Sequence, residues 1–444
     1  MYYYYHVDNC NYNSPNYALI AVNTYFSTIF CTLYGRERSM ATHEETPIYE
    51  QAETVQYNDY MKYFRYTFTA FMTFITIGVI MTSSTFGQIR ISSDQVFERV
   101  RAHDFEINSG YKGVGNLNDE AWKVRTLAIR DLVRLGPGAA SELIGGLHDE
   151  NSHVRHVTVS AISILGIQSA ADDLMKLLTD DPDPVIRGQA AQALGQIGST
   201  KAVKTLEEVS EKDESMHVKH RAALAIGRIK EGAVSGPDEI AAWVSLDENK
   251  FRLAKVGQVA PDFKIKDTSG KSWRISDFKN KKTVALIWIF ADWCPVCHRE
   301  FHELLEMKQK FKDADIQVFT VECHDLYRSS VMGESNEITS TFLKEWGPKS
   351  LSEIGESLMS REKLWWPHLV DTAGAVAAMY GVDPMEFIVH DEWINRPSTV
   401  IITPDGKISF AYYGTYWGDR PTIEETFEMI ENNSYEFRHP ERRE

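Results

Sequence analysis

Four segments between Asp119 and Gly232 repeat one pattern, in which mainly hydrophobic residues occur at helical spacing. The four segments begin 30, 32 and 32 residues apart, at Val124, Val154, Ile186 and Val218. In each segment the matching positions lie four, eight and eleven residues after the start, which puts them on one helical stripe. A shorter helical pattern follows each stripe. Because a two-helix unit cannot bury its stripe alone, the repeat predicts a stacked helical solenoid with a shared core.

From Val256 the pattern changes to alternating strands and helices. TVALIWIF (283–290) predicts a buried strand, CPVCHREFHELLEMKQKF (294–311) a helix, and IQVFTVEC (316–323) a second strand. A Pro-Asp-Gly turn within 398–414 predicts a hairpin, and a helical pattern follows it. This alternation predicts an α/β fold for the second half of the chain.

The first 88 residues follow neither pattern. Residues 1–60 have no helical or strand periodicity, and we interpret them as a doubtful upstream segment without fixed structure. From Met61, two basic residues precede an apolar stretch over 66–81, which is the layout of a secretory signal over 61–88. The alternative is a membrane anchor over 66–81, although that stretch is shorter than the ~20 residues of a spanning helix. Both interpretations predict a periplasmic or other extracytoplasmic protein, secreted or anchored.

The net charge and the cysteine content exclude several classes of protein. The formal net charge of -16 argues against binding to nucleic acid or to an anionic membrane surface, because both require a concentrated basic face. Five cysteines in 444 residues are too few for a disulfide framework. Two of the five, Cys294 and Cys297, stand three residues apart. Such a close pair in a cysteine-poor chain indicates that the two thiols react or bind a ligand.

The stretch ADWCPVCHRE (291–300) places this pair between a predicted strand and a predicted helix. At a helix start the unpaired backbone amides and the helix dipole favour a thiolate, so we expect Cys294 to be the attacking sulfur. Cys297 lies one turn further on and can resolve a mixed disulfide. Pro295 suits the first helical turn, where its missing amide hydrogen costs nothing. Trp293 is expected to shape the surface on which a partner's disulfide docks.

Other chemistries fit the same stretch less well. CPVCH also spells a haem attachment site with His298 as axial ligand, but a covalent haem would unfold the helix start from the sheet. His298 and His302 stand four apart and would supply metal ligands together with the two cysteines, although such a pair is more typical of a solvated helix face. We therefore predict no metal and no organic cofactor. Cys323 is either a third redox thiol or a buried cysteine at a strand end.

Two family resemblances follow from these residues. The repeats resemble HEAT repeats of the short, bacterial, lyase-associated type over about 115 residues. VGQVAPDF, WCPVC with the CHREF that overlaps it, and RPSTVIITPDGKI resemble the redoxin branch of the thioredoxin superfamily, in particular the exported, reducing TlpA/ResA kind and its AhpC/TSA relatives. The second resemblance covers roughly 256–430.

The redoxin resemblance implies further roles. It implies that Glu300 accepts or donates the proton of the more buried cysteine, and that Pro397 forms a cis peptide bond facing the cysteines and a backbone platform for the substrate. Its substrates would be protein disulfides, with an upstream thiol reductant to recycle the pair. One residue departs from the cytosolic thioredoxins: Trp288 stands where they carry a buried acid six positions before the first cysteine.

The chain as a whole therefore predicts a multidomain protein. An all-α HEAT-repeat solenoid over 96–233 and a linker over 234–254 precede an α/β thioredoxin-like domain over 255–434. The predicted function is an exported thiol-disulfide oxidoreductase acting on protein disulfides, with the solenoid docking an unknown protein.

Two alternatives stay open. One is a thiol peroxidase of the peroxiredoxin type, although Ala291 stands where such an enzyme carries a hydroxyl three residues before its catalytic cysteine. The other is a protein-binding HEAT scaffold whose redoxin domain is not catalytic. A deiodinase-related redoxin, suggested by GTYWGDRP, is disfavoured because those proteins typically have a residue without a thiol at the position of Cys297.

Overall fold

The computed structural model describes residues 91–103, 120–333, 338–339, 341–342, 363–382, 384–387, 392–414 and 418–437. The expected upstream segment over 1–60 and the expected signal or anchor over 61–88 lie outside these residues. Within the described ranges, no helix is both long and apolar enough to cross a membrane.

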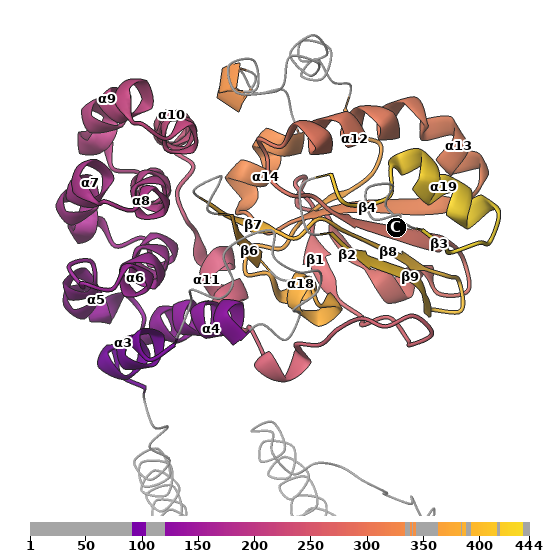
Figure 1. Ribbon diagram of the computed structural model, residues 1–444, viewed down its shortest axis with the longest axis horizontal. Coiled ribbons are helices and arrows are strands. Elements are labelled where there is room, and N and C mark those ends of the chain that lie inside the picture. The colour runs from indigo at the N-terminus through magenta and orange to yellow at the C-terminus, as the bar shows by residue number, and fades with distance from the viewer. Residues whose placement is uncertain are drawn as a thin grey trace, which may run out of the picture. The chain divides into compact units, whose positions relative to one another are not determined.

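The first half of the described chain is a stack of helices (Figure 1). Its members are α3 (Ser93–Arg101), α4 (Glu120–Leu135), α5 (Ala140–Gly146), α6 (Ser152–Leu165), α7 (Ala171–Asp180), α8 (Pro184–Gln196), α9 (Val203–Lys212) and α10 (Met216–Glu231). The predicted stripes lie on α4, α6, α8 and α10, and the starting residues of three of them, Val154, Ile186 and Val218, are buried. The structure confirms the helical solenoid.

The same arginine–aspartate ion pair occurs in each of the two central repeats. Arg155 on α6 contacts Asp181 through Nε at 2.7 Å and Nη2 at 3.0 Å. One period later, Arg187 on α8 contacts Asp213 through the same two atoms at 2.8 and 3.0 Å. Each arginine thus ties the first helix of its repeat to the residue that follows the second helix. Two parallel hydrogen bonds give such a pair a fixed geometry.

The segment expected to be a linker over 234–254 contains one more helix. Helix α11 (Pro237–Val244) packs against α4 and α6 of the solenoid. Arg134 on α4 donates to the Val244 carbonyl at 2.8 Å, which holds the end of α11 in place. The segment therefore runs back along the solenoid before it enters the second half.

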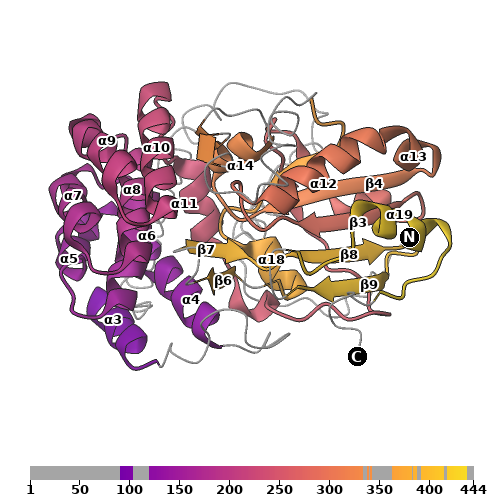
Figure 2. The ribbon, with the colours of Figure 1, turned by 45° about the horizontal axis from the view of Figure 1, so that its top comes forward.

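The second half is built on a five-stranded mixed sheet in the order β5-β4-β3-β8-β9 (Figure 2). The strands are β3 (Thr283–Trp288), β4 (Ile316–Glu322), β5 (His368–Val370), β8 (Ser398–Ile402) and β9 (Ile408–Tyr413). β3 pairs in parallel with β4 and antiparallel with β8. Two short two-stranded sheets accompany it, formed by β1 (Lys264–Lys266) with β2 (Ser272–Arg274) and by β6 (Pro384–Phe387) with β7 (Glu392–Asn395).

Helices cover both faces of this sheet. On one face lie α12 (Pro295–Glu306), α13 (Lys308–Asp313) and α19 (Ile423–Glu431), and on the other lies α18 (Ala375–Tyr380) (Figure 1). The helix α14 (Leu326–Gly333) follows β4 and contacts β5. Successive residues of β3 alternate between the two cores, so that Ile287 packs with α12 and Trp288 packs with α18. The predicted thioredoxin-like α/β fold is confirmed.

One expectation about the backbone is wrong. We expected a cis peptide bond before Pro397, but none of the peptide bonds in the described residues is cis. The trans form of an X–Pro bond is favoured by about 0.5–1 kcal/mol unless the surroundings impose the other. Here the Pro397 carbonyl accepts a hydrogen bond from the Gly414 amide at 2.7 Å, which fixes this segment against the end of β9.

Candidate dithiol active site

The two cysteines of the motif lie where a strand gives way to a helix. Cys294 is the N-cap of α12, and Pro295 occupies the first helical turn, as the sequence predicted. Cys297 lies on the first turn of α12. Neither thiol is in a disulfide, and both cysteines have an exposed fraction of 0%. The two thiols are therefore adjacent and closed off from solvent.

Hydrogen-bond donors from two other segments converge on the sulfur of Cys297. The Phe290 amide donates to it at 3.2 Å, and Nη2 of Arg420 donates to it at 3.1 Å. The other donors of the Arg420 guanidinium bind Glu300 at 2.5 Å through two atoms and the Trp288 carbonyl at 3.0 Å. Arg420 is buried, so its positive charge acts at short range with little screening by water. This arrangement is suited to hold a negative charge on Cys297.

The pKa values of the two thiols move in opposite directions. Burial raises the pKa of Cys297, but the hydrogen bond from the Cys294 thiol, the charge of Arg420 and the Phe290 amide outweigh it and lower that pKa to about 5. Burial and the neighbouring Cys297 sulfur raise the pKa of Cys294 well above its usual value. We expected the helix start to favour a thiolate on Cys294. The charge is instead stabilised on Cys297, because the cation and the amide face that sulfur.

Glu300 is buried on the same helix face, three residues after Cys297. Its burial raises the pKa of its carboxyl to about 7, against the lowering effect of Arg420. A carboxyl with a pKa near neutrality can exchange a proton under ordinary conditions. The carboxylate is therefore not a solvated residue of the first turn, and its assigned role as a proton carrier stays a prediction.

Helix α10 of the solenoid covers the loop that carries Cys294. The ring of Trp293 lies 4.5 Å from the ring of His217 on α10 and 6.4 Å from that of Phe342. Met216 packs against the same core cluster as the two cysteines. The residue expected to line a docking surface for a partner protein thus contacts the solenoid of its own chain.

A network of buried ions lies behind the same loop. Asp292 forms an ion pair with Arg328 on α14. Glu322 contacts His324 Nδ1 at 2.6 Å and His368 Nε2 at 3.1 Å. Burial raises the pKa of Glu322, but its hydrogen bonds to the two histidines outweigh this and lower the pKa to about 2. The network ties the dithiol loop to the end of β4 and to α14.

Three of these residues form a group that could hold a metal ion. Ligand atoms of Asp292, Glu322 and His324 all lie within 4.8 Å of one another. Tetrahedral zinc, with ligand bonds of about 2.0–2.2 Å, would set its ligand atoms about 3.4 Å apart. The 2.6 Å contact between Glu322 and His324 is instead that of a short hydrogen bond. Glu322 is thus paired with His324, whereas Asp292 forms its ion pair with Arg328.

The other residues considered for chemistry lie apart from one another. His298 is buried with Nε2 2.6 Å from the Asp292 carbonyl, whereas His302 pairs with Glu306 at 3.4 Å. The helical pair proposed as metal ligands therefore does not converge. Cys323, at the end of β4, is partly exposed rather than buried.

Sequence reasoning missed Arg420 and the covering residues of the solenoid. The run GTYWGDRP drew attention for its spacing, but no role was assigned to its arginine. The burial of Arg420, which requires a partner for its charge, is visible only in the folded domain. The contact of His217 with Trp293 likewise depends on how the solenoid packs.

A five-stranded sheet of this order, with a dithiol at the start of the helix that follows its central strand, defines a redoxin of the thioredoxin-like class. Comparison with protein families agrees. Residues 256–411 match the AhpC/TSA family, and residues 115–195 and 172–246 match HEAT repeats. The chain therefore carries an AhpC/TSA redoxin domain with HEAT repeats N-terminal to it.

Similar proteins include two bacterial enzymes. The thiol-disulfide oxidoreductase ResA of Bacillus subtilis (strain 168) is 26% identical over 159 residues, which are 36% of this chain and 68% of that protein. ResA of Bacillus cereus (strain ATCC 10987 / NRS 248) is 23% identical over 160 residues, or 36% of this chain and 70% of that protein. Among solved structures, the reduced 2-Cys peroxiredoxin of Plasmodium vivax is 18% identical, covers 40% of this chain and 95% of its own, and has a TM-score of 0.29.

Proposed function

We propose that the protein is a thiol-disulfide oxidoreductase that reduces disulfides of protein substrates through Cys294 and Cys297. The observation that carries this proposal is the placement of Arg420 and the Phe290 amide on the Cys297 sulfur, one helical turn from Cys294. The similarity to ResA supports the same class of reaction. An adjacent pair with one stabilised thiolate can pass two electrons to a disulfide.

The reaction proceeds in two exchanges. Cys294 attacks one sulfur of the substrate disulfide and transfers its proton to the Cys297 thiolate, to which it is hydrogen-bonded. A mixed disulfide forms and the first substrate thiol leaves. Cys297 then loses this proton, with Glu300 as the proposed acceptor, and attacks the Cys294 sulfur. The second substrate thiol leaves, and an intramolecular disulfide remains, which an upstream thiol reductant returns to the dithiol.

Access to a protein substrate requires the solenoid to move. Cys294 has an exposed fraction of 0%, and Trp293 beside it packs on His217 of α10. We propose that binding of a partner protein to the HEAT repeats separates α10 from this loop and exposes Cys294. The solenoid would then act both as docking surface and as cover.

Turnover of insulin disulfides by the full-length protein tests the activity. Wild type should reduce insulin with a dithiol as electron source, and Cys294→Ser should not. Cys323→Ser is the matched control and should retain activity. If wild type and Cys294→Ser reduce insulin at the same rate, the dithiol does not carry the reaction.

A second candidate is a thiol peroxidase. The burial of both thiols favours a small oxidant over a protein, and Arg420 places a cation beside Cys297 that would also face a peroxide oxygen. The Cys297 thiolate would attack the peroxide to give a sulfenic acid and an alcohol or water. Cys294 would condense with it to a disulfide and release water. Trapping of a Cys297 sulfenic acid by dimedone in Cys294→Ser supports the peroxidase; its absence at millimolar peroxide rules that reaction out.

We also propose that the protein is exported and acts outside the cytoplasm. The basic and apolar layout over 61–88 supports a secretory signal. N-terminal sequencing of the protein isolated from its own cells tests this. We expect a mature chain that begins near Gln88, and a chain that begins at Met1 would contradict export by this signal.

A further inference from the structure

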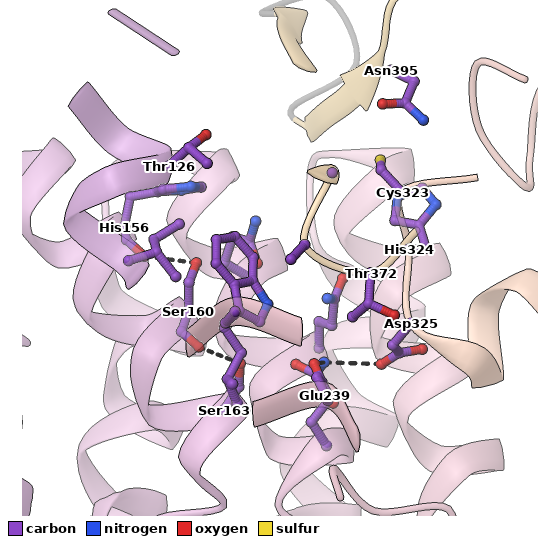
Figure 3. A pocket seen from close by; sticks show the side chains of 18 residues that line it. Thr126, His156, Ser160, Ser163, Glu239, Cys323, His324, Asp325, Thr372 and Asn395 are labelled. Carbon is purple, nitrogen blue, oxygen red and sulfur yellow. Dashed lines mark hydrogen bonds between the residues drawn. The ribbon is translucent and has the colours of Figure 1, made fainter. Parts of the chain in front are cut away.

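A cavity of about 150 Å³ lies between the solenoid and the redoxin domain, away from the two cysteines of the motif (Figure 3). We call it the interdomain cavity. Helices α4, α6, α8 and α11 contribute residues from the solenoid side. The segments that follow β4 and β5, together with the last residue of β7, contribute residues from the redoxin side. Its lining includes Ser160, Gln189, Trp243, Cys323, Thr372 and Asn395.

Asn395 is the residue that points to a ligand. Its side chain is 1% exposed, and neither its amide nitrogen nor its amide oxygen has a hydrogen-bond partner among the described residues. Figure 3 shows its carboxamide beside Cys323 on the redoxin side of the cavity. A buried amide without a partner is costly, because it has lost its hydrogen bonds to water and gained none. A molecule in the cavity can supply both missing bonds.

The remaining walls present little free charge. Burial and the nearby Asp325 raise the pKa of Glu239 to about 8, so this carboxyl is largely protonated at neutral pH. Burial, followed by the charge of Arg125, lowers the pKa of His156 well below its usual value, so this imidazole is neutral. Asp325 is paired with Arg228 and accepts a hydrogen bond from Gln196 at 2.9 Å. An ionic ligand would find no unpaired counter-charge among these groups and would lose its hydration.

The size and chemistry of the cavity define the ligand. An apolar cavity of 150 Å³ in another protein accommodates benzene, so a molecule of about one six-membered ring fits this volume. Asn395 offers a donor and an acceptor side by side, and the group that complements both is another carboxamide or a lactam. Trp243 supplies a flat apolar wall on the opposite, solenoid side.

We propose that the interdomain cavity binds a small, neutral, ring-sized molecule that carries a carboxamide or lactam group and pairs with Asn395. The site is distinct from the dithiol, and the proposal does not depend on the redox function. A bound molecule would contact both the solenoid and the redoxin domain.

Nicotinamide and nicotinate form the matched pair of probes, since they share a ring and differ in carrying a carboxamide or a carboxylate. Calorimetric titration of the full-length protein should detect nicotinamide binding at least tenfold tighter than nicotinate binding. Asn395→Leu should weaken nicotinamide binding by at least tenfold. The exposed Gln309→Leu is the control and should leave binding unchanged. Because leucine removes an unpaired buried amide at similar volume, Asn395→Leu should fold at least as stably as wild type.

Alkylation of Cys323, read by peptide mass spectrometry, gives a second measurement. Nicotinamide should slow the labelling of Cys323 by iodoacetamide in wild type and should leave it unchanged in Asn395→Leu. Three results would overturn the proposal: no nicotinamide binding together with no protection of Cys323, equal binding of nicotinate, or equal binding of nicotinamide by Asn395→Leu.

Discussion

The solenoid and the redoxin domain both contain arginine–carboxylate pairs, half-buried at Arg187 and buried at Arg420, but the arginines differ in what their remaining donors contact. Arg187 binds Asp213 and, through Nη1, the Asp181 carbonyl, all within its own repeat and the turn before it. Arg420 binds Glu300 and gives another hydrogen bond to the sulfur of Cys297. The first arginine is saturated by groups that hold structure. The second directs part of its charge at a reactive atom.

The two kinds of ion pair also differ in whether they recur along the chain. The pairs Arg155–Asp181 and Arg187–Asp213 recur at one period and join residues 26 apart. Arg420 has no periodic counterpart among the described residues and reaches Glu300 across 120 residues and Cys297 across 123. A recurring ion pair is typical of a fold element, whereas a single, long-range pair aimed at a sulfur is typical of a functional site.

Loss of either sulfur of the dithiol should have the largest effect. Cys297→Ser and Cys294→Ser each remove one partner of the exchange, so reduction of insulin should fall by more than about 1,000-fold. If Cys294→Ser kept most of its activity, the reactive site could not be the pair of Cys294 and Cys297.

Arg420→Met tests the comparison directly. Without the cation, burial should raise the pKa of Cys297 from about 5 to its usual range or above. The thiolate fraction at pH 7 should then fall by at least about 30-fold, since a thiol with a pKa of about 8.5 is only about 3% ionised at that pH. Ultraviolet absorbance of the thiolate across a pH series measures this shift.

Arg187→Met is the matched change in the solenoid. It leaves Asp213 without its ion-pair partner and should lower the free energy of unfolding by about 2 kcal/mol. The thiolate titration should stay as in wild type. If both arginine variants shift the titration, or neither does, the distinction between structural and functional pairs fails.

Glu300→Gln should have a smaller effect, confined to pH dependence. Because burial raises the pKa of Glu300 to about 7, the carboxyl is protonated below that pH and can accept a proton above it. The rate of the resolving step should therefore rise with pH through 7 in wild type and lack this rise in the variant, with a loss of about tenfold or more at pH 8. Single-turnover reduction measured from pH 6 to 8 checks it.

The same shift predicts a change in stability with a definite sign. The pKa of Glu300 is higher in the folded protein than the usual 4.3 of a free glutamate. The contribution of the Glu300 carboxyl to the free energy of unfolding is therefore fully present below about pH 4.3. It is lost as the pH rises through about 7. Glu300→Gln should remove this part of the pH dependence in denaturant titrations, and an unchanged profile would contradict a raised pKa.

His217→Ala should have the smallest effect. An edge-to-face aromatic contact is worth about 0.5–1.5 kcal/mol, so its loss should raise the population in which α10 has left the dithiol loop by about 2- to 12-fold. Alkylation of Cys294 should accelerate by the same factor. Glu211→Ala on α9 serves as the control. Equal rates in wild type and His217→Ala would mean that α10 does not limit access.

Local patterns along the chain determined most of the fold. The period of 30 to 32 residues predicted the solenoid, because each stripe must be buried against its neighbours. The apolar run 283–290 followed by CPVC predicted a buried strand and a helix that starts at the cysteines, since strand burial and proline at a helix start are local properties. Helix α11 was missed because its short pattern forms a helix through packing on α4.

The tertiary structure alone decided which thiol bears the negative charge and which groups contact that sulfur. The helix start suggested Cys294, but the amide of Phe290 and the guanidinium of Arg420 both meet at Cys297. The cover formed by His217 over Trp293 and the unpaired amide of Asn395 depend likewise on contacts between distant segments. Periodicity reports which face of an element is buried, but it carries no information about which distant side chain meets that face.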